Sequence, residues 1–139
     1  MPYEVLSTHQ RVRVLCFEQN PADQMAMQDY AWILGWDLLM CREIDQCMQR
    51  ASDSKFDLIV ADLYAGHRPC ALEMVKTIRG ETVGNAELPA LLLSDQPIPE
   101  EAMQKVEQTN DAVIREKPLM MSDLKWVAER FISNNIFRW

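Results

Sequence analysis

The residues of greatest chemical interest are an aspartate, a serine and a lysine, each of which follows or ends a short apolar run. Asp62 ends the run LIVAD, Ser94 ends LPALLLS, and Lys117 follows AVIRE. Two further polar residues, Glu18 and Gln19, follow the run VRVLCF. Carboxylates bind hard cations such as Mg²⁺, and a bound cation permits a phosphoryl group to approach. This set suggests a cation site that could admit a phosphoryl group. Asp62 itself could be a nucleophile presented to a partner, or simply a helix cap or a turn residue.

An alternation of apolar and amphipathic segments predicts the elements that position these residues. Buried strands that alternate with helices are typical of a parallel sheet covered on both faces, and right-handed crossovers make it a doubly wound, five-stranded, three-layer (βα)5 sandwich of the α/β class. Strands are expected at about 12–17, 36–40, 58–61, 88–93 and 112–115, and helices at about 21–34, 44–51, 70–79, from Pro99, and from Ser122 to beyond Phe131.

Local signals mark the ends of the first and last helices. Asn20 followed by Pro21 is typical of a helix N-terminus, and Gly35 is typical of a C-terminus. Ser122 is the expected N-terminal cap of the last helix.

The carboxyl ends of the strands form the edge at which open parallel sheets bind ligands. The polar residues described above would meet there. The segment FEQNPAD after the first strand has no glycine, which argues against a dinucleotide site, and the nucleophile motif G-x-S-x-G of hydrolases is absent. An unrelated doubly wound enzyme that binds a small anion at this edge is the least favoured interpretation of the sequence.

Composition excludes several other classes. The 139 residues suffice for one domain, and the formal charge of −7 without a Lys/Arg cluster argues against nucleic-acid binding. The apolar runs are too short to cross a membrane. Four cysteines, none in a zinc-type spacing, fit reduced thiols in a cytoplasmic protein; they are Cys16, Cys41, Cys47 and Cys70.

The order of these segments over about residues 12–132 resembles the receiver domain of two-component response regulators. VLCFEQNPADQ is similar to the first strand and acidic loop of that family, and FDLIVADLY to the strand that carries its phosphoacceptor aspartate. LPALLLSD and REKP are similar to its hydroxyl-bearing and lysine-bearing strands, and LGWDLLM to its junction before the second strand. The resemblance implies the flavodoxin-like strand order 2-1-3-4-5.

The same resemblance implies a role for each residue of the set. Asp62 would accept a phosphoryl group from a histidine kinase, Lys117 would pair with it, and Ser94 would bind the phosphoryl group and act as a switch. Mg²⁺ would be held by Asp62 and Glu18, with Gln19 at the second acidic position of the family, where an amide brings no charge. The chain would then be a phosphoprotein rather than an enzyme, capable at most of self-phosphorylation and autodephosphorylation.

Two departures favour an alternative within the family. Gln19 lacks the charge of a metal-binding acid, and Ile114 replaces the aromatic switch residue that is common three positions before the lysine. The alternative is an atypical or pseudo-receiver, a protein-interaction module that acts without phosphorylation.

The implied partners are a sensor histidine kinase or phosphotransfer protein and either a downstream protein or an output domain outside this chain. A homodimer through the fourth and fifth helices is a further expectation. Residues 1–10 are expected to form an N-terminal extension, 11–133 the receiver-like domain, and 134–139 a C-terminal tail.

Overall fold

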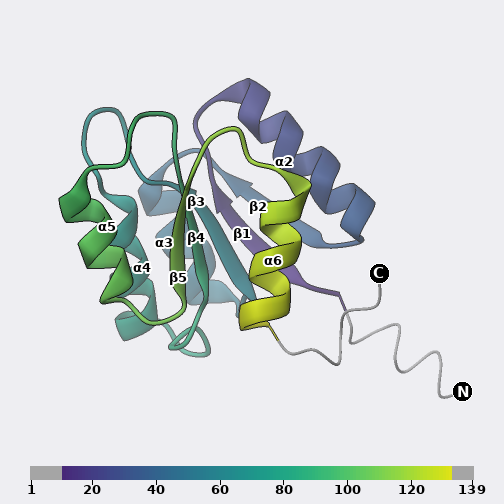
Figure 1. Ribbon diagram of the computed structural model, residues 1–139. Helices are drawn as coiled ribbons and strands as arrows, with labels where there is room; N and C mark the ends of the chain where they lie inside the picture. The colour runs from purple at the N-terminus through teal and green to yellow at the C-terminus, as the bar shows by residue number, and fades with distance from the viewer. Residues whose placement is uncertain (1–10, 133–139) are drawn as a thin grey trace, which may run out of the picture.

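Five parallel strands form one sheet in the order β2-β1-β3-β4-β5, as Figure 1 shows. This confirms the predicted fold class and strand order. The computed structural model describes residues 11–132, so the expected extension 1–10 and tail 134–139 lie outside it. The strands are β1 (Arg13–Phe17), β2 (Asp37–Cys41), β3 (Leu58–Asp62), β4 (Ala90–Ser94) and β5 (Ala112–Glu116). The helices are α2 (Pro21–Leu34), α3 (Ile44–Asp53), α4 (Ala71–Glu81), α5 (Glu100–Glu107) and α6 (Met121–Phe131).

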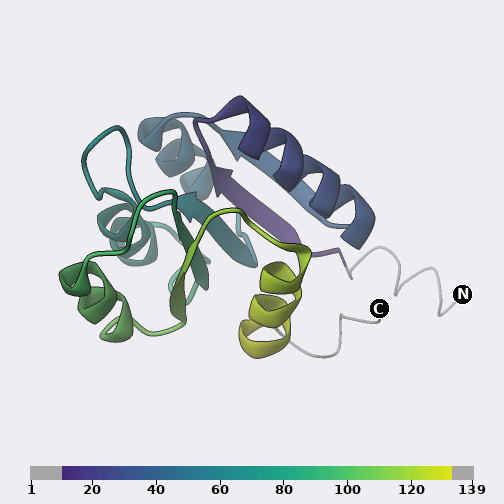
Figure 2. The same ribbon diagram turned by 45° about the horizontal axis from the view of Figure 1, so that its top comes forward.

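The helices cover both faces of the sheet and make three layers (Figures 1 and 2). Helices α2 and α6 pack on one face, where the side chains of Val14, Leu58, Val60, Leu91 and Leu93 contact them. Helices α3, α4 and α5 pack on the other face, against Leu15, Phe17, Ile59, Ala61 and Leu92. Successive residues along each strand therefore pack into the cores on opposite faces of the sheet. This explains why these strands are apolar throughout and do not alternate between apolar and polar residues.

The parallel register brings the carboxyl ends of the strands to one edge. Phe17 is paired with Ala61, and Asp62 with Leu93. Ser94 is paired with Glu116, the residue before Lys117. The segments that follow β1, β3, β4 and β5 therefore start close together.

The signals at the ends of α2 are confirmed, whereas the predicted cap of α6 is wrong. The Asn20 side chain accepts a hydrogen bond from the Asp23 N–H, and Gly35 ends α2 in the left-handed conformation, at φ 72°. Helix α6 begins before Ser122, and the Asp123 carboxylate instead accepts a hydrogen bond from the Met120 N–H at 2.9 Å. The residue that precedes the helix is thus Met120, and an acid in the first turn accepts a hydrogen bond from its backbone N–H.

Within residues 11–132, no helix is both long and apolar enough to cross a bilayer.

A buried asparagine, Asn85, connects the loop before β4 to the segment before β3. Its Oδ1 accepts a hydrogen bond from the Phe56 N–H at 2.9 Å, and its Nδ2 donates to the Ala51 and Ser54 carbonyls at 2.8 and 3.0 Å. The side chain is only 1% exposed, so water cannot replace these bonds in a truncated variant.

Asn85→Ala is therefore expected to lower the free energy of unfolding by about 2 kcal/mol, because it leaves buried backbone groups unpaired. The measurement is urea unfolding followed by circular dichroism. Asn110→Ala, at an exposed position, is the control and should leave the midpoint unchanged. An Asn85→Ala midpoint equal to that of the control would contradict the structural role of Asn85.

Candidate functional site

The predicted lysine–aspartate pair is present at the carboxyl edge of the sheet. Lys117 Nζ lies 2.7 Å from Asp62 Oδ1 and 2.9 Å from Glu18 Oε1. The three side chains are between 5% and 13% exposed, so the charges lie largely out of water. The expectation that residues after β1, β3 and β5 meet at one point is thus correct for these three.

Backbone contacts fix the chain on either side of this cluster. The Lys117 N–H donates to the Ser94 carbonyl at 2.7 Å, and the Glu18 N–H donates to the Cys41 carbonyl at 3.0 Å. The Glu18 carbonyl accepts a hydrogen bond from the Gln24 side chain at 2.7 Å. Each of these bonds joins a residue of the cluster, or its neighbour, to an adjacent strand or helix.

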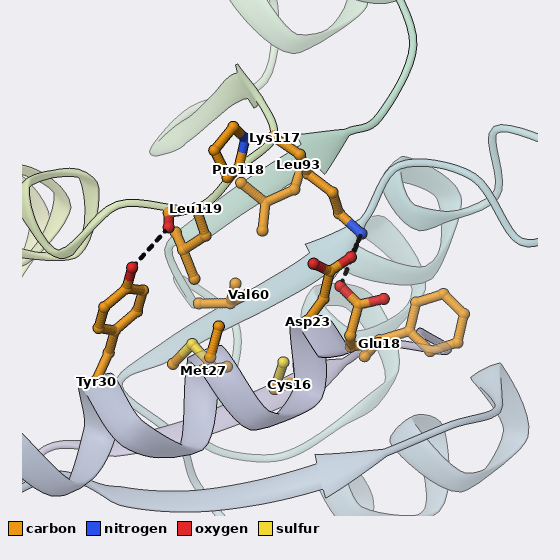
Figure 3. A pocket seen from close by; sticks show the side chains of 12 residues that line it. Cys16, Glu18, Asp23, Met27, Tyr30, Val60, Leu93, Lys117, Pro118 and Leu119 are labelled. Carbon is orange, nitrogen blue, oxygen red and sulfur yellow. Dashed lines mark hydrogen bonds and ion pairs between the residues drawn. The ribbon is translucent and has the colours of Figure 1, made fainter. Parts of the chain in front are cut away.

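A third carboxylate, Asp23, also contacts Lys117. Its Oδ2 lies 2.7 Å from Lys117 Nζ, and Figure 3 shows Asp23 and Glu18 directed at the same ammonium group. Sequence reasoning missed this residue because first-turn acids are common at helix N-termini. The available signal was its position, in the first turn of the helix that follows the acidic loop.

Asp62 lies beside a cavity of about 220 Å³ that opens at the edge of the sheet. Lys117, Gln19 and Tyr64 line the same cavity, together with Asn20, Gly66, Leu93, Asp95 and Gln96. A second cavity, of about 100 Å³, lies on the other side of Lys117, between α2 and the segment before α6. There the Tyr30 hydroxyl donates a hydrogen bond to the Leu119 carbonyl at 3.1 Å (Figure 3).

The two expected switch residues make other contacts in this arrangement. Ser94 is 1% exposed, and its hydroxyl donates to the Gln96 carbonyl at 2.8 Å. Ile114 is buried in the core formed with α3, α4 and α5. Ser94 therefore needs to exchange a hydrogen bond before it can reach a group on Asp62.

Burial and charge shift the pKa values of the pair. Burial, together with the neighbouring Glu18 carboxylate, raises the pKa of Asp62 from 3.8 to about 7, although Lys117 opposes the shift. Burial alone would lower the pKa of Lys117, but the neighbouring carboxylates of Asp23, Asp62 and Glu18 outweigh it and raise that pKa. Asp62 Oδ1 is buried without a well-directed hydrogen bond, so its short contact with Lys117 is an ion pair.

Comparison with known proteins identifies the fold. No family model matches the chain, and no curated protein matches it. The solved structure of the Vibrio cholerae chemotaxis protein CheY4 matches with a TM-score of 0.74 and 18% identity, covering 88% of this chain and 99% of that one. This chain has the receiver-domain fold. A second match is HP1043, an orphan response regulator of H. pylori, with a TM-score of 0.70 and 20% identity over 89% of this chain and 98% of that one.

A third receiver-fold match bears on the expected metal. The receiver domain of the sensor histidine kinase PA1611 from Pseudomonas aeruginosa has a TM-score of 0.70 and 16% identity, covers 88% of this chain and 98% of that one, and has a magnesium ion coordinated in its active-site cleft. Whether the present receiver fold offers comparable ligands depends on its own donor atoms.

The donor atoms of this receiver fold do not fit Mg²⁺. Glu18 Oε1 binds Lys117, and Oε2 accepts a hydrogen bond from the Asn20 N–H at 3.0 Å. The Gln19 amide donates to the Arg42 carbonyl at 3.3 Å. Across residues 11–132, no group of three or more His, Cys, Asp or Glu side chains is placed to hold a metal ion. Mg²⁺ needs a near-octahedral set of oxygen ligands, and Asp62 is the single largely buried carboxylate beside the cavity.

Proposed function

We propose that this chain is a receiver-type signalling domain in which Asp62 accepts a phosphoryl group from a phosphohistidine of a sensor kinase or phosphotransfer protein. The observation that carries the proposal is the pairing of Asp62 with Lys117 at 2.7 Å beside an open cavity at the carboxyl end of β3. The receiver fold supports it, because ligands of such sheets bind at this edge.

The transfer uses Asp62 as a nucleophile. A carboxylate oxygen of Asp62 attacks phosphorus, a P–O bond forms, and the P–N bond to the donor histidine breaks with release of its imidazole. The product is an aspartyl phosphate. The Lys117 ammonium, already in contact with Asp62, neutralises charge on a phosphoryl oxygen. Only deprotonated Asp62 can react.

Phosphorylation of Asp62 changes the surface of the domain through the segment after β4. The Ser94 hydroxyl exchanges its bond to the Gln96 carbonyl for one to the phosphoryl group, and the chain between β4 and α5 shifts. The surface of α5 and α6 then changes for a downstream protein, an output domain or a second copy of this chain. The domain acts as a signalling protein in the cytoplasm rather than as an enzyme.

The test is intact-mass spectrometry after incubation with acetyl phosphate, with and without Mg²⁺. The parent should gain one phosphoryl group, and Asp62→Asn should gain none. Asp95→Asn, which changes another acid beside the same cavity, should be labelled like the parent. Labelling of Asp62→Asn, or no labelling of the parent even by a phosphorylated histidine protein, would contradict the proposal.

A second candidate is a pseudo-receiver that binds a partner protein without phosphorylation. Two residues favour this candidate. The Gln19 amide is hydrogen-bonded to Arg42, just after β2, and Ile114 is buried in the core. This candidate predicts partner binding that Asp62→Asn leaves unchanged, whereas the first predicts binding that depends on Asp62.

A further inference from the structure

The geometry points to Lys117 as the resident cation of the Asp62 site, in the place of a divalent metal ion. Glu18 and Asp23 anchor the Lys117 ammonium group, and Asp23 is the residue that positions it. This inference rests on the proposed function, since it concerns how Asp62 is prepared for a phosphoryl group. The role of Asp23, however, can be tested without phosphorylation.

Three carboxylates surround one ammonium group. Lys117 Nζ lies 2.7 Å from Asp23 Oδ2, 2.7 Å from Asp62 Oδ1 and 2.9 Å from Glu18 Oε1. A lysine ammonium has three N–H donors and no acceptor. Glu18 and Asp23 accept hydrogen bonds from two of these donors, and Asp62 Oδ1 contacts the ammonium as an ion pair. With these three carboxylates in contact, Lys117 is only 12% exposed.

The position of Asp23 follows from the start of α2. The Asp23 N–H donates to the Asn20 side chain at 3.1 Å, so the cap that begins the helix also fixes the residue that holds Lys117. Glu18 is equally fixed, because its second oxygen accepts the Asn20 N–H. Asn20 thus orients both anchors, and Figure 3 shows the two carboxylates directed at the Lys117 ammonium group.

A divalent ion would have to compete with this arrangement. Glu18 has no oxygen without a partner, and it does not line the cavity beside Asp62. To gain a second buried carboxylate ligand, a metal ion would have to displace Lys117 from Glu18. The cavity itself offers the largely buried carboxylate of Asp62, the exposed carboxylate of Asp95 and the neutral amide of Gln19. This is a weak set of ligands for Mg²⁺, which dehydrates reluctantly.

The first test measures metal binding with Mn²⁺ as the probe, by the relaxation rate of water protons. The parent should show no saturable site at millimolar Mn²⁺. The double variant Gln19→Asp/Asp23→Asn, which adds a carboxylate ligand and removes one anchor of Lys117, should acquire one. The inference would be overturned if the parent bound one Mn²⁺ per chain and Asp62→Asn bound none. It would also be overturned if the double variant bound Mn²⁺ no more tightly than Gln19→Asp alone.

The second test measures the rate of labelling by acetyl phosphate in EDTA and in Mg²⁺. The parent should be labelled equally in both. Asp23→Asn should be labelled about tenfold more slowly in EDTA, because Lys117 loses an anchor, and Asp23→Glu should restore the rate. Labelling of the parent that requires Mg²⁺ would overturn the inference. A parent that is labelled neither in these buffers nor by a phosphorylated histidine protein would instead refute the proposed function, and the Mn²⁺ measurement would then decide the inference by itself.

Discussion

Lys117→Met is expected to lower the free energy of unfolding by about 3 kcal/mol at neutral pH, since removing one partner of a buried ion pair strands the other charge. The stranded group is Glu18, which is 4% exposed and keeps a single hydrogen bond, from the Asn20 N–H. Asp62 and Asp23 lose the same cation. Methionine fills the space of the lysine stem but supplies no donor.

The pH dependence of this loss has a defined sign. The pKa of Lys117 is raised in the folded state, so its contribution to stability is fully present below the unfolded value of 10.5 and is lost only as the pH rises through the folded value. The difference between parent and variant should therefore persist from neutral pH to about pH 10.

Urea unfolding at several pH values measures the effect, with Lys105→Met as control. Lys105 forms an exposed ion pair with Glu101 at 3.4 Å. Such a pair contributes only about 0.3 kcal/mol to the free energy of unfolding. A second variant, Glu18→Gln/Lys117→Met, should recover part of the loss because it removes the stranded charge. If Lys117→Met unfolds at the same urea concentration as Lys105→Met, the cluster does not stabilise the fold in the way described.

The fold could be predicted from the sequence because its signals are local and repeated. The strands β1, β3 and β4 are buried on both faces, and such strands read as continuous apolar runs. Asn20, Pro21 and Gly35 set the ends of α2 by their own backbone and hydrogen-bonding preferences. The start of α6 could not be predicted as reliably, because serine is a common cap by type, whereas here the Asp123 carboxylate accepts the Met120 N–H and the helix begins before Ser122.

The candidate site could be predicted only as far as the backbone determines it. Residues that directly follow parallel strands meet at one edge, which placed Asp62, Lys117 and Glu18 together. The contact of Asp23 with Lys117 and the bond of Ser94 to the Gln96 carbonyl depend on side-chain conformation. No sequence pattern specifies which of several nearby acids a lysine will bind.

Asp62→Asn is expected to stabilise the fold at pH 8 by about 1 to 2 kcal/mol, which corresponds to a rise in Tm of about 3 to 6 °C for a domain of this size. The pKa of Asp62 is raised from 3.8 to about 7 because the carboxylate is largely buried beside Glu18. The complete shift corresponds to about 4 kcal/mol, and the solvent that reaches the cavity reduces this value. Asparagine has nearly the same shape and no charge.

The sign of the pH dependence separates this effect from a general improvement in packing. A group whose folded pKa is raised stabilises the native state below its unfolded pKa, and that contribution is lost as the pH rises from about 4 to 7. The gain in Tm of Asp62→Asn over the parent should thus be absent near pH 4, grow through this range and level off above about pH 7. Differential scanning calorimetry across the range measures it, and Asp95→Asn, at an exposed position, should show no such trend.

A gain that does not vary with pH would be an effect of packing and would contradict the prediction. A loss at pH 8 would show that Lys117 stabilises ionised Asp62 more than burial destabilises it. The expected result carries a functional consequence as well. Asp62 is then a residue whose charge costs stability in the resting domain, and selection for stability alone would favour the neutral amide. Stability lost at a carboxylate that faces an open cavity and contacts a lysine is the pattern expected of a reactive group, and it supports Asp62 as the phosphoacceptor.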